Sequence, residues 1–195
     1  MARRRLAVLL SGRGSNFEAI ADAVESGAIP NAEIVAVLSD VPDAVGLARA
    51  TVRGLPAVAV DRMRYGSRRD HEAAVLERLA EARPDLVCLA GYMRLLSPEF
   101  VARWRGRILN IHPALLPKFP GLHVQRRALE AGETESGCTV HFVDEGTDTG
   151  PIVLQRRVPI LPGDTEDSLS ARILAEEHRA YPLAIAGVLD ALPKA

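Results

Sequence analysis

Apolar runs of strand length alternate with amphipathic segments along most of this 195-residue chain. Helical patterns occur at Ser15–Ser26 and Arg69–Ala82, where apolar residues recur at spacings of three and four. The runs between them are short and almost wholly apolar, as expected of strands covered on both faces of a sheet: Leu6–Leu10, Ile34–Leu38, Ala57–Val60, Leu86–Ala90 and Ile108–Ile111. This alternation predicts an α/β fold with a parallel sheet and right-handed crossovers.

The alternation changes in the last third of the chain. Two runs of strand character, Cys138–Val143 and Pro151–Ile160, are separated only by the polar loop Asp144–Gly150. Because this loop has no room for a crossover helix, at least one of the two strands should run antiparallel or lie at an edge. A final long helix is expected from about Thr165 to Leu192, and Pro182 should kink or divide it. We predict one domain, residues 1–195, built as a Rossmann-like three-layer sandwich with a mostly parallel sheet.

Composition limits the function classes that remain. Lys and Arg together number 24 and Asp and Glu 25, a formal net charge of −1. This balance lacks the basic excess of a general nucleic-acid binder. No apolar stretch is long enough to span a bilayer, and two distant cysteines, Cys88 and Cys138, suit a reducing cytoplasm. We expect a cytoplasmic monomer or homodimer that acts on small molecules and binds neither nucleic acid nor membranes.

A glycine-rich loop, Ser11-Gly-Arg-Gly-Ser-Asn16, directly follows the first expected strand and precedes a helix. Such a loop lets the backbone approach an anion, and the helix start supplies free N–H groups. The P-loop pattern fails because no Gly-Lys-Ser/Thr follows, and the dinucleotide fingerprint fails at its third glycine, where Phe17 stands. Two interpretations remain: a cradle for a single phosphate, or a tight turn in which Ser15 or Asn16 caps the helix.

The fifth apolar run is interrupted by Asn110 and His112, which an extended strand projects to the same side. A carboxamide and an imidazole can serve an acyl centre, Asn110 for a developing oxyanion and His112 for the proton. Asp148 follows in a later loop, and if it lay near His112 it would raise the pKa of the imidazole toward or above neutrality. The alternative is a pair of buried polar groups satisfied by neighbouring backbone.

Other kinds of site fit the sequence less well. Asp148-Thr-Gly150 matches the tripeptide of aspartic proteases, but that chemistry needs a second carboxylate from a second copy, and the chain has one. Four potential metal ligands, Cys138, His141, His112 and His123, lack the spacing of a known metal site, so no metal is expected. Without a Gly-x-Ser-x-Gly nucleophile elbow, covalent catalysis is not indicated.

Five motifs in chain order resemble the phosphoribosylglycinamide formyltransferase family: Ser11–Asn16, Ala90–Pro98, Leu109–Gly121, Val140–Val143 and Asp148–Pro151. The resemblance covers nearly the whole chain and extends to Gly163–Asp167 and Glu176–His178. It implies that the chain transfers the formyl group of 10-formyltetrahydrofolate, its cosubstrate, to the amine of glycinamide ribonucleotide. The products would be formylglycinamide ribonucleotide and tetrahydrofolate, in de novo purine biosynthesis.

The resemblance also implies roles for single residues. The N-terminal half would bind the ribonucleotide, with its phosphate on Gly14, Ser15 and Asn16, and Glu177 would contact the same substrate from the last helix. The C-terminal half would bind folate and hold the catalytic residues. These residues would be Asn110, His112 and Asp148, with His141 in support.

Folate binding is implied for three segments and for Asn110. The residues concerned are Arg68, Met93, Arg94, Leu95, Leu96, Asn110, Asp144, Glu145, Gly146, Thr147 and Asp148. Beside the folate loop, Ala114–Gly121 contains two prolines and Lys118, and we expect it to act as a mobile lid.

Two other functions use similar residues. A formyltetrahydrofolate deformylase would transfer the formyl group to water, but its relatives carry an additional N-terminal domain, for which an expected first strand at about residue 6 leaves no room. A non-catalytic nucleotide sensor would explain the glycine loop but not Asn110, His112 and Asp148.

Overall fold

A seven-stranded sheet with the order β3-β2-β1-β4-β5-β6-β7 forms the centre of the computed structural model, which describes residues 3–193. The first five strands pair in parallel, and β6 and β7 are antiparallel additions at one edge. The strands are β1 (Arg4–Leu10), β2 (Ala32–Ser39), β3 (Ala57–Ala59), β4 (Leu86–Leu89), β5 (Ile108–His112), β6 (Glu135–Phe142) and β7 (Ile152–Pro159). The predicted fold class is confirmed, including the change to antiparallel strands.

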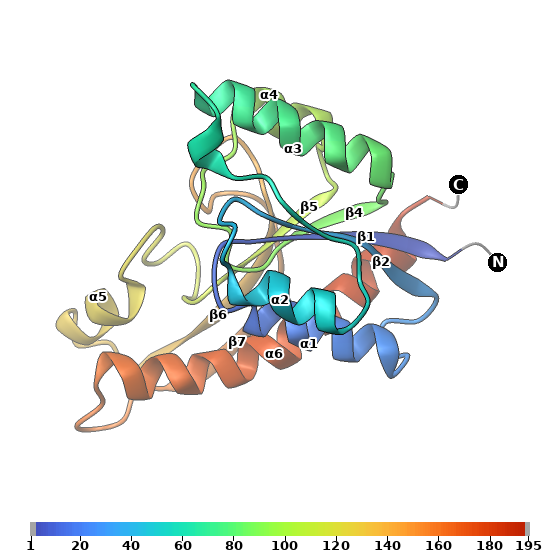
Figure 1. The fold of residues 1–195 in the computed structure, drawn as a ribbon. Helices are drawn as coiled ribbons and strands as arrows, with labels where there is room; N and C mark the ends of the chain where they lie inside the picture. Colours follow the sequence, from blue (N-terminus) through green and yellow to red (C-terminus); the bar gives the residue numbers. More distant parts are fainter. Residues whose placement is uncertain (1–2, 194–195) are drawn as a thin grey trace.

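Helices cover both faces of the sheet (Figure 1). Helices α3 and α4 lie on one face, and α1, α2 and α6 lie on the other. The helical elements are α1 (Ser15–Glu25), α2 (Val45–Val52), the 3₁₀ turn η1 (Arg62–Arg64), α3 (Arg68–Ala82), α4 (Pro98–Arg103), α5 (Val124–Glu130) and α6 (Glu166–Ala191). The sequence pattern indicated α1, α3 and α6. It did not indicate α2, α4 or α5, because helices of six to eight residues show too few turns for a clear period.

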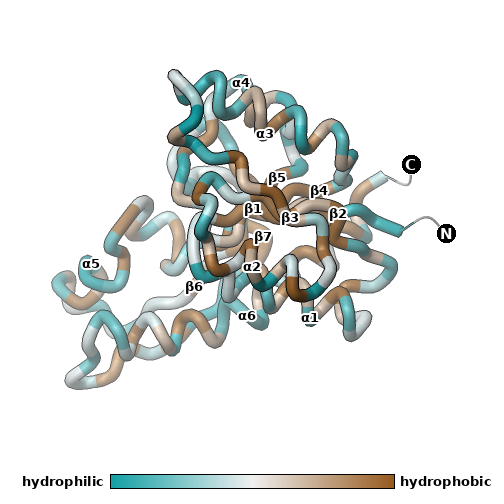
Figure 2. The backbone as a smooth tube through the Cα atoms, in the orientation of Figure 1, coloured by the Kyte–Doolittle hydropathy of each residue, from teal (hydrophilic) through white to brown (hydrophobic). Residues whose placement is uncertain are grey.

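Strand β1 shows why the central runs are apolar without alternation. Every residue from Leu6 to Leu10 is fully buried. Leu6, Val8 and Leu10 pack into the core on one face, while Ala7 and Leu9 pack into the core on the other. Figure 2 shows this hydrophobic centre between the more polar helices. Because β1, β4 and β5 are parallel neighbours in the sheet, their carboxyl ends lie side by side at one edge.

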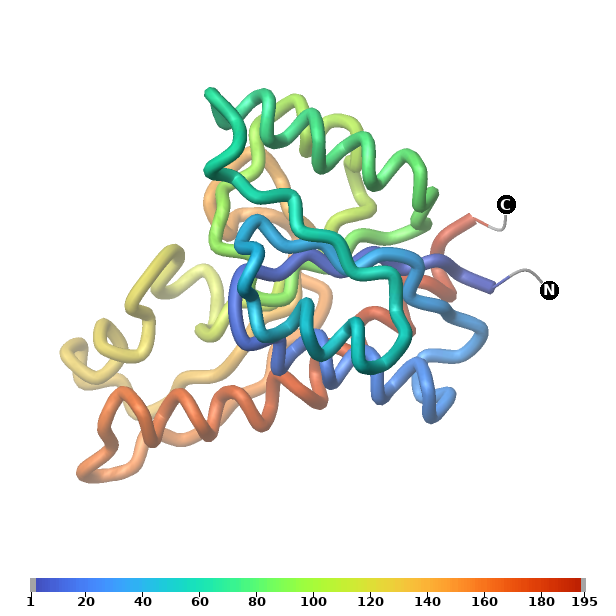
Figure 3. The backbone as a smooth tube through the Cα atoms, viewed as in Figure 1, coloured from blue at the N-terminus to red at the C-terminus, as the bar shows by residue number. Residues whose placement is uncertain are grey.

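Helix α6 runs beside α1 and against the antiparallel strands (Figure 3). It begins at Thr165, whose hydroxyl accepts a hydrogen bond from the Ser168 N–H in a capping box. Of the two expected effects of Pro182, division of the helix is wrong, because the helix continues from Glu166 to Ala191, and a kink stays a prediction. A proline within a helix costs about 3 kcal/mol. Burial of side chains such as Tyr181 and Ile185, each worth about 1.5–3 kcal/mol, offsets this cost.

Candidate active site

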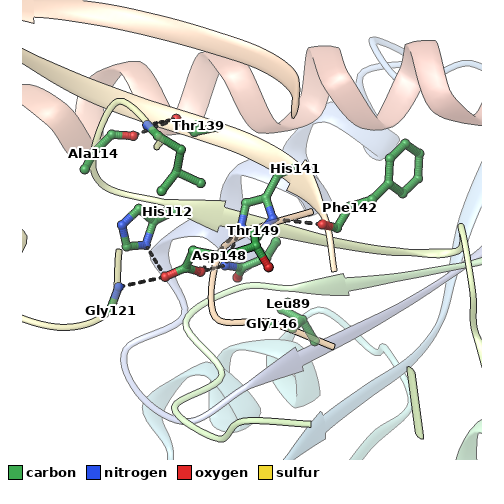
Figure 4. Close-up of polar contacts among 12 residues, drawn as sticks. Leu89, His112, Ala114, Gly121, Thr139, His141, Phe142, Gly146, Asp148 and Thr149 are labelled. Carbon is green, nitrogen blue, oxygen red and sulfur yellow. Dashed lines mark hydrogen bonds and ion pairs between the residues drawn. The ribbon is translucent and has the colours of Figure 1, made fainter. Parts of the chain in front are cut away.

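Asn110, His112, His141 and Asp148 lie together where β5 and β6 meet the loop that follows β6. Asn110 and His141 are paired residues of neighbouring antiparallel strands. The carboxylate of Asp148 lies between the two histidines (Figure 4), with Oδ2 3.3 Å from His112 Nδ1 and Oδ1 3.5 Å from His141 Nε2. The contact between His112 and Asp148, which the sequence alone could not establish, is therefore present.

The orientation of Asn110 is fixed by His141. His141 Nδ1 lies 2.9 Å from the carbonyl oxygen of Phe142 and must donate to it, so a neutral ring has an acceptor at Nε2. Asn110 Nδ2 donates to that Nε2 at 3.2 Å and reaches Asp148 Oδ1 at 3.5 Å. The amide N–H groups of Asn110 are thus directed into the cluster, and donation to a substrate oxygen requires that one of these bonds be exchanged.

His112 is buried and faces a hydrogen-bond acceptor at each ring nitrogen. Its Nε2 lies 2.9 Å from the carbonyl oxygen of Phe119, and its Nδ1 faces Asp148. Burial nevertheless lowers the pKa of His112 below its ordinary value, although the Phe119 carbonyl and the charge of Asp148 act to raise it. The expected rise of this pKa is therefore wrong, because the desolvation of a buried cation outweighs one nearby carboxylate.

Asp148 is held by the backbone as well as by the histidines. It adopts a left-handed conformation (φ 54°), and its Oδ2 accepts a hydrogen bond from the N–H of Gly121 at 2.9 Å. Burial acts to raise the pKa of Asp148, but the neighbouring His141 ring, the hydrogen bond from the Gly121 N–H and the neighbouring His112 together lower it. The carboxylate is thus kept ionised in a partly buried position.

The 114–121 segment is part of this cluster rather than separate from it. Its Phe119 carbonyl and Gly121 N–H contact His112 and Asp148. The buried hydroxyl of Thr139 donates to Ala114 O at 2.6 Å and accepts from Leu116 N at 3.1 Å. These bonds fasten the segment expected to be a mobile lid to β6.

Gln155 on β7 strengthens this attachment. Its Nε2 lies 2.9 Å from both Leu116 O and Thr139 Oγ1. His112, Thr139 and Gln155 occupy one row across β5, β6 and β7, because the two strand registers pair them in turn. No sequence pattern indicated Gln155, because its role depends on this row.

The glycine loop ends in an α1 N-terminus that no side chain caps within residues 3–193. The N-cap residue is Gly14, with φ 75°, so capping by Ser15 or Asn16 does not occur. A Cβ at Gly14 would lie 2.7 Å from Gly46 Cα, which leaves room only for glycine. The free N–H groups at this helix start favour the phosphate-cradle interpretation.

A hydrogen bond between Asn16 and Glu177 joins α1 to α6 beside this loop. Asn16 Nδ2 donates to Glu177 Oε2 at 2.7 Å in a buried position. Burial raises the pKa of Glu177, and the bond from Asn16 opposes this rise. The Oδ1 atom of Asn16 is buried with no hydrogen-bond partner in the described part of the chain. A buried acceptor in this state is suited to a donor from a ligand.

Among the residues expected to bind folate, Arg68 and the 93–96 segment are linked through Glu72. Arg68 Nε lies 3.0 Å from Glu72 Oε1, which also accepts from the N–H of Ser97 at 3.0 Å. This carboxylate therefore joins the start of α3 to the segment containing Met93, Arg94, Leu95 and Leu96. Met93 and Leu95 are 67% and 64% exposed, which is unusual for apolar side chains beside a polar cluster.

The loop expected to complete the folate site has a defined internal structure. Asp144 Oδ1 accepts from Gly146 N at 3.0 Å and from the Thr149 hydroxyl at 2.7 Å. Glu145 lies 3.3 Å from Arg105, which follows α4. The loop containing Asp144, Glu145, Gly146, Thr147 and Asp148 therefore presents its last residue to His112 and its middle to the solvent.

Ser11, Asp40 and Arg62 form a polar contact that sequence analysis did not assign. The buried Asp40 accepts from the Ser11 hydroxyl at 2.5 Å and pairs with Arg62 at 2.9 Å. Ser11 Oγ also accepts from Met93 N at 2.9 Å, so the glycine loop and the 93–96 segment are linked. Within residues 3–193, no three His, Cys, Asp or Glu side chains are grouped to hold a metal ion. In the same range, no helix is long and apolar enough to cross a membrane.

Comparison with known proteins shows the family of the chain. Residues 4–185 match the family described as formyl transferase. The chain belongs to the formyl transferase family. This family member is 45% identical to the phosphoribosylglycinamide formyltransferase of Escherichia coli, covering 95% of the chain and 87% of that protein. This match confirms the family resemblance that the sequence motifs indicated.

Larger proteins contain a similar segment. The formyl transferase chain is 56% identical over 189 residues to the trifunctional purine biosynthetic protein adenosine-3 of Drosophila melanogaster. This match covers 96% of the chain but only 14% of the length of that relative. Similarity to the trifunctional protein therefore concerns one part of it.

Solved structures share the whole fold. Glycinamide ribonucleotide transformylase 1 from Symbiobacterium toebii superimposes with a TM-score of 0.94 at 50% identity, covering 99% of this chain and 91% of that one. Phosphoribosylglycinamide formyltransferase from Brucella melitensis gives a TM-score of 0.92 at 49% identity, with 99% of both chains covered. The chain therefore shares its α/β architecture with these two structures.

Proposed function

We propose that this formyl transferase moves the formyl group of 10-formyltetrahydrofolate to the amine of glycinamide ribonucleotide, the formyl transfer step of purine biosynthesis. The observation that carries the proposal is the meeting of His112, Asp148 and Asn110 in one cluster. The uncapped start of α1 lies at the same edge of the sheet, because β1 and β5 flank β4. One substrate's phosphate and the other's formyl group can therefore be held on one side of the molecule.

The chemistry follows from the state of His112. The neutral amine attacks the formyl carbon, a C–N bond forms, and the formyl oxygen becomes an oxyanion. This charge favours the protonated imidazole, so His112, which burial keeps largely neutral, gains a proton as the intermediate forms. The attacking amine supplies that proton. His112 then gives a proton to N10 of the folate as the bond between N10 and the formyl carbon breaks, the oxyanion becomes a carbonyl again, and tetrahydrofolate leaves. No acyl-enzyme is needed.

Asn110 and Asp148 support this transfer in different ways. Asn110 donates to the oxyanion, and one well-directed donor of this kind is worth about 2.7–4 kcal/mol. Asp148 opposes the desolvation of the imidazolium and orients the ring through Nδ1. His141 keeps the amide of Asn110 directed into the site.

The ribonucleotide fits the features around the glycine loop. Its phosphate accepts from the N–H groups of Gly14, Ser15 and Asn16 at the start of α1. A ribose hydroxyl supplies the missing donor to Asn16 Oδ1 and another to the carboxylate of Glu177. The buried pair thus selects a sugar phosphate over inorganic phosphate.

The folate fits beside the catalytic cluster, where the 93–96 segment follows β4 and the 144–148 loop ends at Asp148. The exposed apolar side chains of Met93 and Leu95 cover its ring system, and the charge of Arg68 suits its carboxylates. Both ligands are small molecules, and the proposed enzyme is cytoplasmic and needs no metal. A deformylase or a nucleotide sensor has no support among the similar proteins described above.

The test is tetrahydrofolate release from 10-formyltetrahydrofolate with and without glycinamide ribonucleotide. Release should depend strictly on the acceptor, and formylglycinamide ribonucleotide should appear in equal amount. Equal release of tetrahydrofolate without the acceptor would identify a hydrolase. No release of tetrahydrofolate under either condition would favour a non-catalytic nucleotide sensor.

A further inference from the structure

Tyr181 is the largest fully buried side chain among the described residues, and its hydroxyl contacts the backbone of both β4 and β5. Its Oη is 3.0 Å from the carbonyl oxygen of Leu89 and 3.0 Å from that of Leu109. Leu89 is the last residue of β4, and Leu109 directly precedes Asn110. We propose that Tyr181 is a positioning residue that holds the backbone from which Asn110 projects and the path of the folate segment.

The argument depends on the planarity of the peptide bond. The Leu109 carbonyl and the Asn110 nitrogen belong to one rigid plane, so a hydrogen bond to this oxygen restrains the backbone that carries the Asn110 side chain. The Leu89 carbonyl belongs in the same way to the plane leading into Ala90. From Ala90 the backbone continues through Gly91, which has φ 74°, to Met93. One hydroxyl therefore restrains the backbone on both sides of the proposed folate site.

The two carbonyls share a single donor. Leu89 and Asn110 are paired residues at the end of the β4–β5 ladder, where the parallel strands separate. The hydroxyl has one proton, which the carbonyls of Leu89 and Leu109 both accept. Both hydrogen bonds can be short only when β4 and β5 are held at one separation. Burial raises the pKa of Tyr181 well above its ordinary value, which keeps the hydroxyl protonated as a donor.

Helix α6 connects this restraint with the ribonucleotide side. Glu177 lies one turn before Tyr181 on α6, and both side chains are buried. Glu177 contacts Asn16 at the start of α1, whereas Tyr181 contacts β4 and β5. One face of one helix thus sets the position of both proposed substrate sites, an inference that rests on the proposed function.

The test compares Tyr181→Phe with Ile185→Val. The first removes only the hydroxyl, and the second removes a methylene from a fully buried residue one turn later on the same helix. Well below the melting temperature of both variants, Tyr181→Phe should lower kcat about ten- to hundredfold, as expected of a misplaced reactive group. Its KM for the ribonucleotide should change less than about threefold. A kcat equal to that of Ile185→Val, or a loss confined to KM, would overturn the proposal.

A second measurement does not require activity. The carboxamide ¹⁵N and ¹H resonances of Asn110 should shift in Tyr181→Phe and stay unchanged in Ile185→Val. Unshifted Asn110 resonances in Tyr181→Phe would also overturn the proposal. If the wild-type chain released no tetrahydrofolate, the proposed function would fail, while these resonances would still decide the role of Tyr181.

Discussion

Asp148 Oδ2 lies 3.3 Å from Nδ1 of His112, and the opposite ring nitrogen lies 2.9 Å from the carbonyl of Phe119. Both neighbours are acceptors, so only the imidazolium can donate at both nitrogens. Burial opposes that cation and lowers the pKa of His112. The site is therefore built to stabilise a charge that desolvation disfavours in the free protein, and a negative charge on a bound substrate would reverse the balance.

Replacing Asp148 by asparagine should reduce turnover more than binding. Without the carboxylate, burial lowers the pKa of His112 further, because one of the effects that opposes burial is lost. We expect kcat to fall by about 10²-fold or more, the range of general acid–base contributions. Steady-state kinetics should show a KM for the ribonucleotide within about threefold of wild type.

The same substitution at the exposed Asp43 is the matched control and should leave kcat and KM unchanged. NMR titration of the His112 ring gives the direct measurement of its pKa. A His112 pKa that stayed the same or rose in Asp148→Asn would contradict the role given to the carboxylate.

Glu177→Gln should weaken ribonucleotide binding. The substitution replaces an acceptor of the Asn16 amide by a group that can also donate, so the buried pair no longer presents a carboxylate to the ribose. We expect KM for glycinamide ribonucleotide to rise about tenfold, equivalent to about 1.4 kcal/mol, and KM for folate to stay constant. Glu176→Gln, at the adjacent position that pairs with Arg179, serves as the control. A larger rise in KM for folate than in KM for the ribonucleotide would contradict the assignment of Glu177 to the ribonucleotide site.

Thr139→Val should distinguish the contribution of the Thr139 hydroxyl from that of the side chain's shape, because valine keeps the shape and lacks the hydroxyl. Thr139 is fully buried, and its loss as a hydrogen-bonding group leaves the Leu116 N–H and the Ala114 carbonyl without this partner. Urea unfolding should show a loss of about 1–3 kcal/mol, the cost of buried polar groups left unsatisfied. Because the 114–121 segment contacts His112 and Asp148, kcat should fall as well. Thr139→Ser, which retains the hydroxyl, should recover most of both; equal damage in Ser and Val variants would exclude this role.

Stability should decline as the pH is lowered below about 6.5, the ordinary histidine value. Burial lowers the pKa of His112 and of His178 in the folded chain, so the unfolded chain binds protons first and unfolding is favoured. Asp148, whose folded pKa is also lowered, adds a further loss below its ordinary value of 3.8. Glu177 acts in the opposite direction, because its pKa is raised by burial.

Urea unfolding at a series of pH values between 7.5 and 5 measures this dependence directly. His178→Gln should reduce the slope, because the glutamine side chain does not titrate. A free energy of unfolding that rose on acidification across this range would contradict the assigned directions.

The residue pattern by itself determined the architecture. The apolar run Leu6–Leu10 of β1 and the helical spacing of α1 and α3 reflect a parallel sheet that is covered on both faces, and such patterns are local. The polar residues Asn110 and His112 interrupt an apolar strand, which marked them without any contact information. The glycine loop was equally visible, since the need for glycine at Gly14 is a property of the backbone there.

Tertiary structure decided what the pattern left open. Packing carried α6 through Pro182, because buried side chains offset the lost hydrogen bond. The pKa of His112 moved in the direction opposite to the prediction, since desolvation depends on everything around the ring. Phe119, Gly121, Gln155 and Tyr181 contribute backbone or distant contacts that no spacing encodes. Sequence determines which groups are available, whereas only the folded chain sets their distances and their exposure to water, on which their protonation and their chemistry depend.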